Sequence, residues 1–318
     1  MSGELDWSSL RGIATNLLAG NLIAIFTAAA VVLSVPFILH YLLYRRVASP
    51  PISTFVLLGP SGSGKTALLT LLEFASLRRA GSVPPTRTSQ TSTTITAILP
   101  PSVPIASNRY RSVNDPSLSE AKRSPAKYVL KDTPGHGKLR ESQGLSFIAD
   151  ALRSKKKKDK ANVKGIIYMV DAAALADSND ALRDAAAYLH DVLLTIQRTV
   201  LSRRRSTKAG SNAVSVLVAA NKQDLFTALP AGSVQAKLEA EIDRIRKSRQ
   251  RGLMEAGSRE EDEEDILGGD DGRGTFTFAL LEEEVGIRVQ VLGGAVKSEG
   301  ETAGAGVRKW EEWIGSCL

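Results

Sequence analysis

An eight-residue segment constrains the fold of this chain more than any other part of its sequence. Residues Gly59 to Thr66 fit the pattern G-x-x-x-x-G-K-[ST]. They follow the apolar run Phe55 to Leu58, which is typical of a buried strand, and they precede the helical sequence Ala67 to Arg79. A plain glycine-rich turn is the alternative, but it requires neither the strand before it nor the helix after it. The segment therefore predicts a phosphate-binding loop in an α/β fold.

The residues of this loop have separate expected roles. Glycines let backbone N–H groups turn inward around phosphate oxygens, and the following helix presents its positive N-terminal end. Lys65 would reach the β and γ phosphates, and the Thr66 hydroxyl would ligate Mg²⁺. The predicted phosphate-contacting residues are Gly59, Ser61, Gly62, Ser63, Gly64, Lys65, Thr66 and Ala67.

A second segment supplies a carboxylate for the same site. Asp132 to His136 reads Asp-Thr-Pro-Gly-His and follows the strand-like residues Tyr128 to Lys131. We expect Asp132 to hold Mg²⁺ through a water molecule and the N–H of Gly135 to meet a γ-phosphate. An isolated D-x-x-G is a common turn. Its place between the phosphate loop and the segment described next favours the functional interpretation.

A third segment indicates which base is bound. Asn221 to Asp224 reads Asn-Lys-Gln-Asp and follows the apolar run Ser215 to Ala220. The Asp224 carboxylate can accept both N1–H and N2–H of guanine, whereas adenine presents a different pattern. Asn221 and Lys222 would brace the loop and flank the ring. A solvated loop is the alternative, but the three segments together predict a site for GTP or GDP with Mg²⁺.

A hydroxyl-rich loop lies between the first two segments, from Gly81 to Ser92. Its sequence Thr88-Ser89-Gln90-Thr91-Ser92 offers several candidates for a second Mg²⁺ ligand, of which we favour Thr91. A solvated loop is again the alternative.

The order of apolar and amphipathic segments predicts a doubly wound, mostly parallel sheet with helices on both faces. The expected strands are 54–58, 93–99, 128–131, 165–170, 215–220 and 289–292, and the expected helices are 65–79, 178–202, 232–248 and 307–314. We expect strand 93–99 to run antiparallel to strand 128–131, because an exposed loop joins them instead of a crossover helix. Ligands of such sheets bind at the carboxyl ends of the strands, where all the motifs fall.

The N-terminal part has a different character. No Lys, Arg, Asp or Glu occurs from Leu22 to Tyr44, which predicts a transmembrane helix. Arg45 and Arg46 follow at once, and this bias would place the C-terminal domain in the cytosol. A cleaved signal peptide is disfavoured because the apolar run is too long. The predicted divisions are a lumenal N-terminus (1–21), the span (22–44), a linker (45–53) and a nucleotide domain (54–318) with insertions at 100–126 and 257–274.

Charged segments outside the motifs receive no site. The basic runs Arg153 to Lys160 and Arg203 to Lys208 lack interleaved aromatic residues, so we interpret them as solvated loops and expect no sequence-specific nucleic-acid binding, although RNA or anionic lipid is an alternative. Cys317 is the sole cysteine, which excludes an intramolecular disulfide. The cysteine and three histidines do not form a metal-ligand pattern.

Taken together, these motifs resemble the Ras-like small GTPases, especially their Arf and Sar branch. With an N-terminal span, the chain resembles the family of signal recognition particle receptor β subunits. Gln90-Thr91-Ser92, Pro134-Gly135-His136 and Lys309-Trp310 support this resemblance. It implies a fifth motif at Ala295 to Lys297, where Ala295 replaces the usual serine while Lys297 would still contact the base. It also implies that His136 takes the place of the catalytic glutamine.

The resemblance further implies a receptor subunit of the endoplasmic reticulum membrane with a cytosolic nucleotide domain. Its GTP form would hold the receptor α subunit close to ribosomes and the translocon, and its hydrolysis would be slow. Three alternatives stay open: an Arf-like trafficking GTPase, a scaffold that holds GTP permanently, and a membrane-tethered ATPase or kinase.

Overall fold

The computed structural model divides the chain after Pro51 into two units, which are described separately. The described residues are 22–47, 52–77, 84–105, 125–153, 162–206, 214–255, 266–268, 274–297 and 305–318. The predicted N-terminus 1–21, basic residues 154–160 and acidic residues 260–265 lie outside these ranges, as does most of the insertions 100–126 and 257–274.

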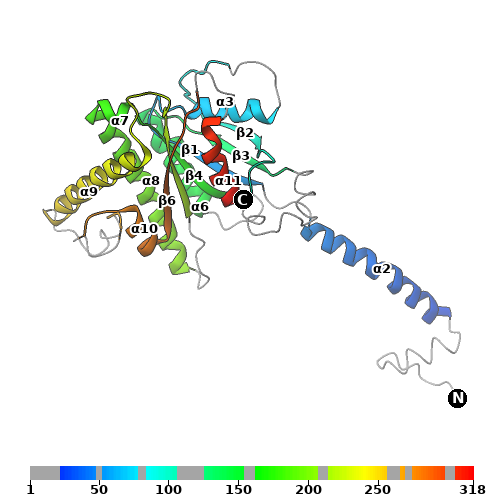
Figure 1. The fold of residues 1–318 in the computed structure, drawn as a ribbon. Coiled ribbons are helices and arrows are strands. Elements are labelled where there is room, and N and C mark those ends of the chain that lie inside the picture. The colour runs from blue at the N-terminus through cyan, green and yellow to red at the C-terminus, as the bar shows by residue number, and fades with distance from the viewer. Residues whose placement is uncertain are drawn as a thin grey trace. The chain divides into compact units, whose positions relative to one another are not determined.

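The first unit contains one described helix, α2 (Leu22–Val47), with Pro36 inside it (Figure 1). The side chains of α2 that the structure describes are exposed within this chain. Across the described residues, no helix combines the length and the apolar character that crossing a bilayer requires. The helix at 22–44 is thus present, and the transmembrane role stays a prediction.

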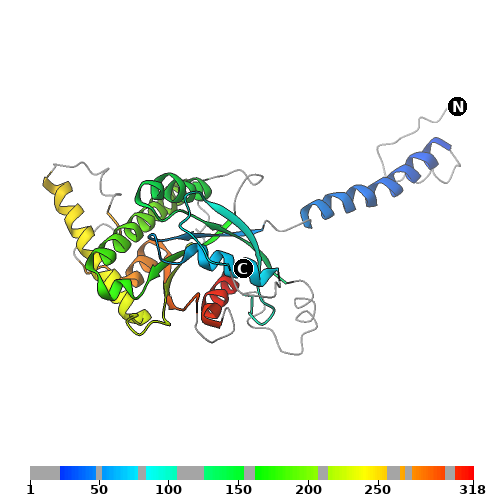
Figure 2. The ribbon, with the colours of Figure 1, turned by 90° about the horizontal axis from the view of Figure 1, so that it is seen from above.

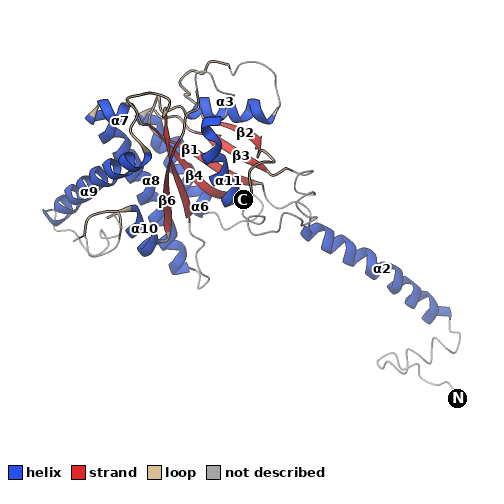
Figure 3. Ribbon diagram, viewed as in Figure 1, coloured by secondary structure: helices blue, strands red, loops and turns tan. Residues whose placement is uncertain are grey.

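The second unit is built on a mixed sheet of six strands in the order β2-β3-β1-β4-β5-β6 (Figure 3). The strands are β1 (Ser53–Leu58), β2 (Thr93–Ile98), β3 (Lys127–Asp132), β4 (Asn162–Asp171), β5 (Val214–Asn221) and β6 (Ile287–Gly293). Only the β2–β3 pair among them is antiparallel, which confirms the prediction. The parallel strands place their carboxyl ends, and hence the three motifs, at one edge of the sheet.

Helices cover both faces of this sheet (Figures 1 and 2). The longer ones are α3 (Lys65–Ser76), α6 (Ser146–Arg153), α8 (Asn179–Ser206), α9 (Ala231–Glu255), α10 (Phe278–Val285) and α11 (Arg308–Cys317). One hydrophobic cluster joins α6, α8, α9 and α10 to one face, and a second joins α3 and α11 to the other. The result is a three-layer arrangement of helices, sheet and helices.

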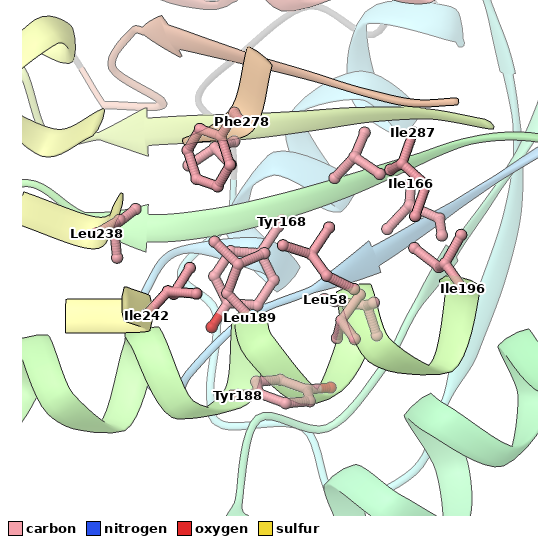
Figure 4. Close-up of a cluster of buried hydrophobic side chains, with 14 of the residues drawn as sticks. Leu58, Ile166, Tyr168, Tyr188, Leu189, Ile196, Leu238, Ile242, Phe278 and Ile287 are labelled. Atoms are coloured by element: carbon pink, nitrogen blue, oxygen red, sulfur yellow. The ribbon is translucent and has the colours of Figure 1, made fainter. Parts of the chain in front are cut away.

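The alternation of side chains along β1 shows how one strand serves both layers. Val56 and Leu58 belong to the α8 cluster, while Phe55 and Leu57 belong to the α3 cluster, and all four are fully buried. Successive side chains of a strand point to opposite faces, so a strand buried on both sides is apolar throughout. Figure 4 shows Leu58 and Tyr168 of the sheet packed against Tyr188 and Leu189 of α8.

The structure also contains elements that the sequence analysis did not predict. These are α5 (Gly137–Leu139), a π-helix (Arg140–Leu145), α6, α7 (Ala174–Asp177), α10 and a 3-10 helix (Ala305–Val307). Helix α10 is capped at its start by Thr277, whose hydroxyl accepts from the N–H of Leu280, and it ends at Gly286 in left-handed backbone. The predicted helices occur at their expected places, with ends displaced by up to seven residues in the described part.

Candidate functional site

The phosphate loop is shaped by backbone conformations that only glycine adopts readily. Gly59 and Gly64 have φ angles of 136° and 98°. A Cβ atom on Gly59 would lie 2.1 Å from the carbonyl oxygen of Met169, and one on Gly64 would lie 2.2 Å from Nδ2 of Asn221. The close approach of β4 and of Asn221 therefore explains these two glycines. Gly64 directly precedes α3, so the N-terminus of that helix faces the loop.

Lys65 lies inside the loop and is held by it. Its Nζ donates to the carbonyl oxygens of Gly59 and Pro60, both at 2.8 Å. Burial lowers the pKa of Lys65 to about 8, although the nearby Asp132 carboxylate opposes this shift. An additional anion beside the ammonium group would stabilise its charged form.

Thr66 and Asp132 meet at the base of the loop. The Thr66 hydroxyl donates to Oδ2 of Asp132 at 2.6 Å, and Oδ1 of Asp132 is buried without a hydrogen-bond partner among the described residues. Burial raises the pKa of Asp132, while Thr66, Lys65 and the approaching Ser89 hydroxyl lower it. A hydroxyl and a buried carboxylate oxygen without a partner are hard oxygen ligands, so these residues fit Mg²⁺.

A cavity of about 180 Å³ opens over the loop. Its lining residues are Ser61, Gly62, Gly64, Lys65, Thr66, Ala67, Thr86, Arg87, Thr88, Ser89 and Gly135. Thus the structure brings most of the predicted phosphate-contacting residues to one cavity. Thr91, the favoured second Mg²⁺ ligand, is exposed and does not line it, whereas Thr88 and Ser89 from the same predicted loop do.

The segment after Asp132 packs tightly at first and then turns outward. A Cβ atom on Gly135 would lie 2.6 Å from Nζ of Lys65 and 2.7 Å from the N of Ser61, so Gly135 lies directly against the phosphate loop. The next residue, His136, is exposed and does not line the cavity. In the π-helix that follows, Arg140 donates from Nε to the Gly135 carbonyl and pairs through both terminal nitrogens with Asp184, each at 2.7 Å.

The predicted base-reading segment is tied to the phosphate loop by one side chain. Nδ2 of Asn221 donates to the Ser63 carbonyl at 2.8 Å, and its Oδ1 accepts from the N–H of Val296 at 3.1 Å. Asn221 is buried, and its hydrogen bonds connect the base-reading segment to the phosphate loop and to the predicted motif at Ala295 to Lys297. Ala295 is buried within that fifth motif, whereas Lys297 is exposed.

Lys222 and Asp224 lie at the rim of this segment. Lys222 has a φ of 65°, a left-handed conformation that is uncommon outside glycine and is frequent at functional sites. Its Nζ pairs with Oδ2 of Asp171, whose Oδ1 accepts from the N–H groups of Ala173 and Ala174. The Asp224 side chain is exposed.

The comparisons with known proteins show the family to which this chain belongs. The family described as "Signal recognition particle receptor beta subunit" matches residues 51–285. A relative of the same description from Saccharomyces cerevisiae is 30% identical over 271 residues, which cover 83% of this chain and 84% of the relative. The chain belongs to this family.

Two solved structures from Chaetomium thermophilum show the fold of the family. The complex described as SRb-GTP/SRX matches with a TM-score of 0.60 and 34% identity, covering 82% of this chain and 98% of that one. The structure described as SRb-GDP-Mg matches with a TM-score of 0.56 and 34% identity, covering 85% and 100%. This member of the beta-subunit family has the Ras-like GTPase α/β fold with a mixed sheet.

Four residues of the site were missed by the sequence analysis. Arg87 lines the cavity, Arg140 holds Gly135, and Asp171 holds Lys222. Gln143 of the π-helix accepts from the N–H of Ser92 and donates to the Gln90 carbonyl. The sequence contained a signal for Asp171, because it ends an apolar strand that precedes the strand ending at Asn221. It contained no signal of comparable strength for Arg87, Arg140 or Gln143.

Proposed function

We propose that this chain is a guanine-nucleotide-binding subunit of the signal recognition particle receptor, and that it holds GTP or GDP with Mg²⁺ at the site described above. Asn221 carries this proposal. It bonds to the phosphate loop and to the Val296 backbone, so a phosphate-binding segment and a base-reading segment 158 residues apart form one site. The solved relatives described as SRb-GTP/SRX and SRb-GDP-Mg are consistent with the proposal.

The residues of the site divide the work of binding. Backbone N–H groups of the phosphate loop and the N-terminus of α3 receive the phosphates, and Lys65 exchanges its contacts with Gly59 and Pro60 for phosphate oxygens. Mg²⁺ supplies charge neutralisation at the phosphates when bound. Thr66 and Asp132 would hold this ion, the latter through water, and Thr91 would join them only if its segment moves.

We assign recognition of the base to Asp224, with Lys222 beside the ring and with the backbone at Ala295 and the Lys297 side chain in contact with the base. The test is the variant Asp224→Asn, in which guanine should lose its preferred partner and xanthine should gain one. Binding of labelled guanine, xanthine and adenine nucleotides to the full chain measures this, with Asp150→Asn on α6 as an exposed matched control. Unchanged GTP affinity in Asp224→Asn would contradict the base assignment, and ATP competing equally with GTP in the unmodified chain would favour the ATPase or kinase alternative.

Hydrolysis is proposed to be slow, on the order of 10⁻⁴ s⁻¹, as in an unstimulated Ras-type site. The residue assigned to orient water, His136, faces solvent outside the cavity and would have to turn inward. The same observation supports a second candidate, a scaffold that holds GTP without hydrolysing it. Single-turnover hydrolysis with and without the partner separates the two, because a scaffold shows no rate in either case.

The partner is proposed to be the receptor α subunit, bound in the GTP state at the endoplasmic reticulum membrane for protein targeting. Affinity purification of the detergent-extracted chain, loaded separately with GTP and GDP, tests this. Recovery of the α subunit with GTP alone supports a switched receptor, and equal recovery supports the scaffold. Vesicle-coat or tethering factors in its place would indicate an Arf-like trafficking protein.

Membrane anchoring by α2 is also part of the proposal, and it rests on the uncharged sequence from Leu22 to Tyr44. The full chain should stay with the membrane fraction after alkaline carbonate extraction. Its release into the supernatant would contradict an anchor.

A further inference from the structure

The phosphate cavity has a second wall that none of the phosphate-binding motifs accounts for. Thr86, Arg87, Thr88 and Ser89 line it together with the phosphate loop. Of these residues, Arg87 alone carries a positive charge. The cavity already presents Lys65 and the N-terminus of α3, which both favour an anionic ligand. The guanidinium of Arg87 adds a further positive charge at the same place.

The other cations around the cavity are already engaged. Lys65 donates to two loop carbonyls, and Arg140 forms a two-point ion pair with Asp184. Arg87, in contrast, makes neither a hydrogen bond nor an ion pair with any other residue that the structure describes, and it is exposed. Its five N–H donors are therefore available for a ligand of the cavity.

The backbone on either side keeps Arg87 close to the cavity. On one side, Pro84 and Pro85 restrict the chain that enters the segment. On the other side, Ser89 lines the same cavity, and its hydroxyl approaches the Asp132 carboxyl group. Because Asp132 is fully buried at the end of β3, this approach brings the segment against the phosphate site two residues beyond Arg87.

We propose that Arg87 binds the phosphates of the nucleotide held by its own chain. It does so from the Thr86 to Ser89 wall of the cavity, which is separate in sequence from the phosphate loop. A guanidinium group forms charge-assisted, two-point hydrogen bonds with phosphate oxygens, which lysine cannot reproduce in geometry. This inference rests on the proposed function, since it assumes that the cavity takes phosphates. It makes Arg87 the residue through which the Thr86 to Ser92 segment senses the nucleotide.

The experiment compares Arg87→Ala and Arg87→Lys with Arg251→Ala in the full chain. Arg251 is an exposed arginine of α9, and no described residue pairs with it, so its loss removes the same net charge away from the cavity. Dissociation constants for labelled GDP and a non-hydrolysable GTP analogue are measured at low and high salt, and thermal unfolding without nucleotide checks folding. Arg87→Ala should weaken binding at least tenfold and flatten the salt dependence, and Arg87→Lys should recover part of the loss.

The possible outcomes separate this inference from the proposed function. If the unmodified chain binds neither nucleotide, the proposed function fails. If it binds and Arg87→Ala lies within twofold of Arg251→Ala for both nucleotides, the function stands and the Arg87 assignment is wrong. A loss that is larger for the GTP analogue than for GDP places the guanidinium at the terminal phosphate.

Discussion

The phosphate loop and the Thr86 to Ser92 segment border the same cavity, yet they are held in different ways. The loop is fixed by close packing, with Gly59 against the Met169 backbone and Ser63 bonded to Asn221. The Thr86 to Ser92 segment has mostly exposed or half-buried side chains, and its described contacts are those of Ser89 with Asp132 and of Gln90 and Ser92 with Gln143.

This difference indicates which half of the site is preorganised before a ligand binds. The loop is held in one conformation by its close packing against β4 and Asn221. Little conformational entropy is therefore lost when the loop binds a ligand. The Thr86 to Ser92 segment has few buried contacts and can take a second position at low cost. A nucleotide-dependent change would therefore be carried by this segment and not by the loop.

The largest effect should come from filling the space beside Gly64. In Gly64→Ala, a Cβ atom would collide with Nδ2 of Asn221 in a backbone conformation that disfavours it. We expect loss of nucleotide binding by at least about a hundredfold and a loss of stability of about 1–3 kcal/mol. Titration calorimetry and chemical denaturation measure the two quantities.

Gly62→Ala is the control, because Gly62 also has a positive φ of 79° but a Cβ there meets no atom within 4 Å. Equal losses in the two variants would show that backbone strain alone, and not the contact with Asn221, shapes the loop.

The next effect should follow from Asn221→Ala. This change removes the bonds to Ser63 and Val296 and leaves the buried Ser63 carbonyl and the part-buried Val296 N–H without this partner, which costs about 1–3 kcal/mol. Nucleotide release should accelerate about tenfold or more, because both halves of the site loosen together. Stopped-flow release of a fluorescent nucleotide is the measurement. An unchanged release rate would show that the loop keeps its shape without Asn221.

A smaller effect should appear as pH dependence. The pKa of Lys65 is about 8 in the ligand-free protein, so the ammonium group is present below pH 8 and is lost above it. Bound phosphates raise this pKa, and binding above pH 8 therefore takes up a proton. The contribution of Lys65 to nucleotide affinity should therefore be constant below pH 8. Above pH 8 the affinity should fall by up to about tenfold per pH unit.

Lys65→Arg is the matched control, since a guanidinium keeps its charge in this range. A fall of the same size in Lys65→Arg would assign the pH dependence to another group. In the absence of nucleotide, the unfolded lysine holds its proton to a higher pH, so the Lys65 contribution to stability should improve as pH rises from 8 to about 10.5.

The smallest effect should come from Gln143→Ala, which cuts the described link between the π-helix and the Thr86 to Ser92 segment. Its exposed hydrogen bonds, at 3.0 and 3.4 Å, contribute about 1 kcal/mol or less to stability. Nucleotide affinity should change by less than about threefold, while limited proteolysis of the segment should become faster in the GTP-loaded protein. A strong loss of affinity would show that the segment is as rigidly held as the loop.

The sequence predicted the parts of the site that local patterns encode. Lys65, Thr66 and Asp132 were predicted because each directly follows a recognisable strand or turn; Lys65 and Thr66 line the cavity, and Asp132 accepts a hydrogen bond from Thr66. The antiparallel β2 was predicted because the sequence between it and β3 reads as a loop and not as a crossover helix. In both cases the information lies in the element itself and in the segments that adjoin it along the sequence.

The remaining parts depend on contacts between distant segments. The pairing of Lys222 with Asp171 requires the register of β4 against β5, which aligns Asp171 with Asn221. Arg87 and Gln143 acquire their positions from the path of loops and from a π-helix, for which the sequence has no strong pattern. Helix α10 was missed because eight residues are too short for a clear helical period.

The most direct test of the account is the binding of purified receptor α subunit to the full-length chain loaded with a GTP analogue or GDP, beside Asp224→Asn loaded with the corresponding xanthine nucleotides. We predict that the unmodified chain binds the α subunit with the GTP analogue and not with GDP, and that Asp224→Asn binds it only with the xanthine triphosphate analogue. Equal binding with GDP, or full binding of Asp224→Asn with the GTP analogue, would contradict a guanine-switched receptor subunit.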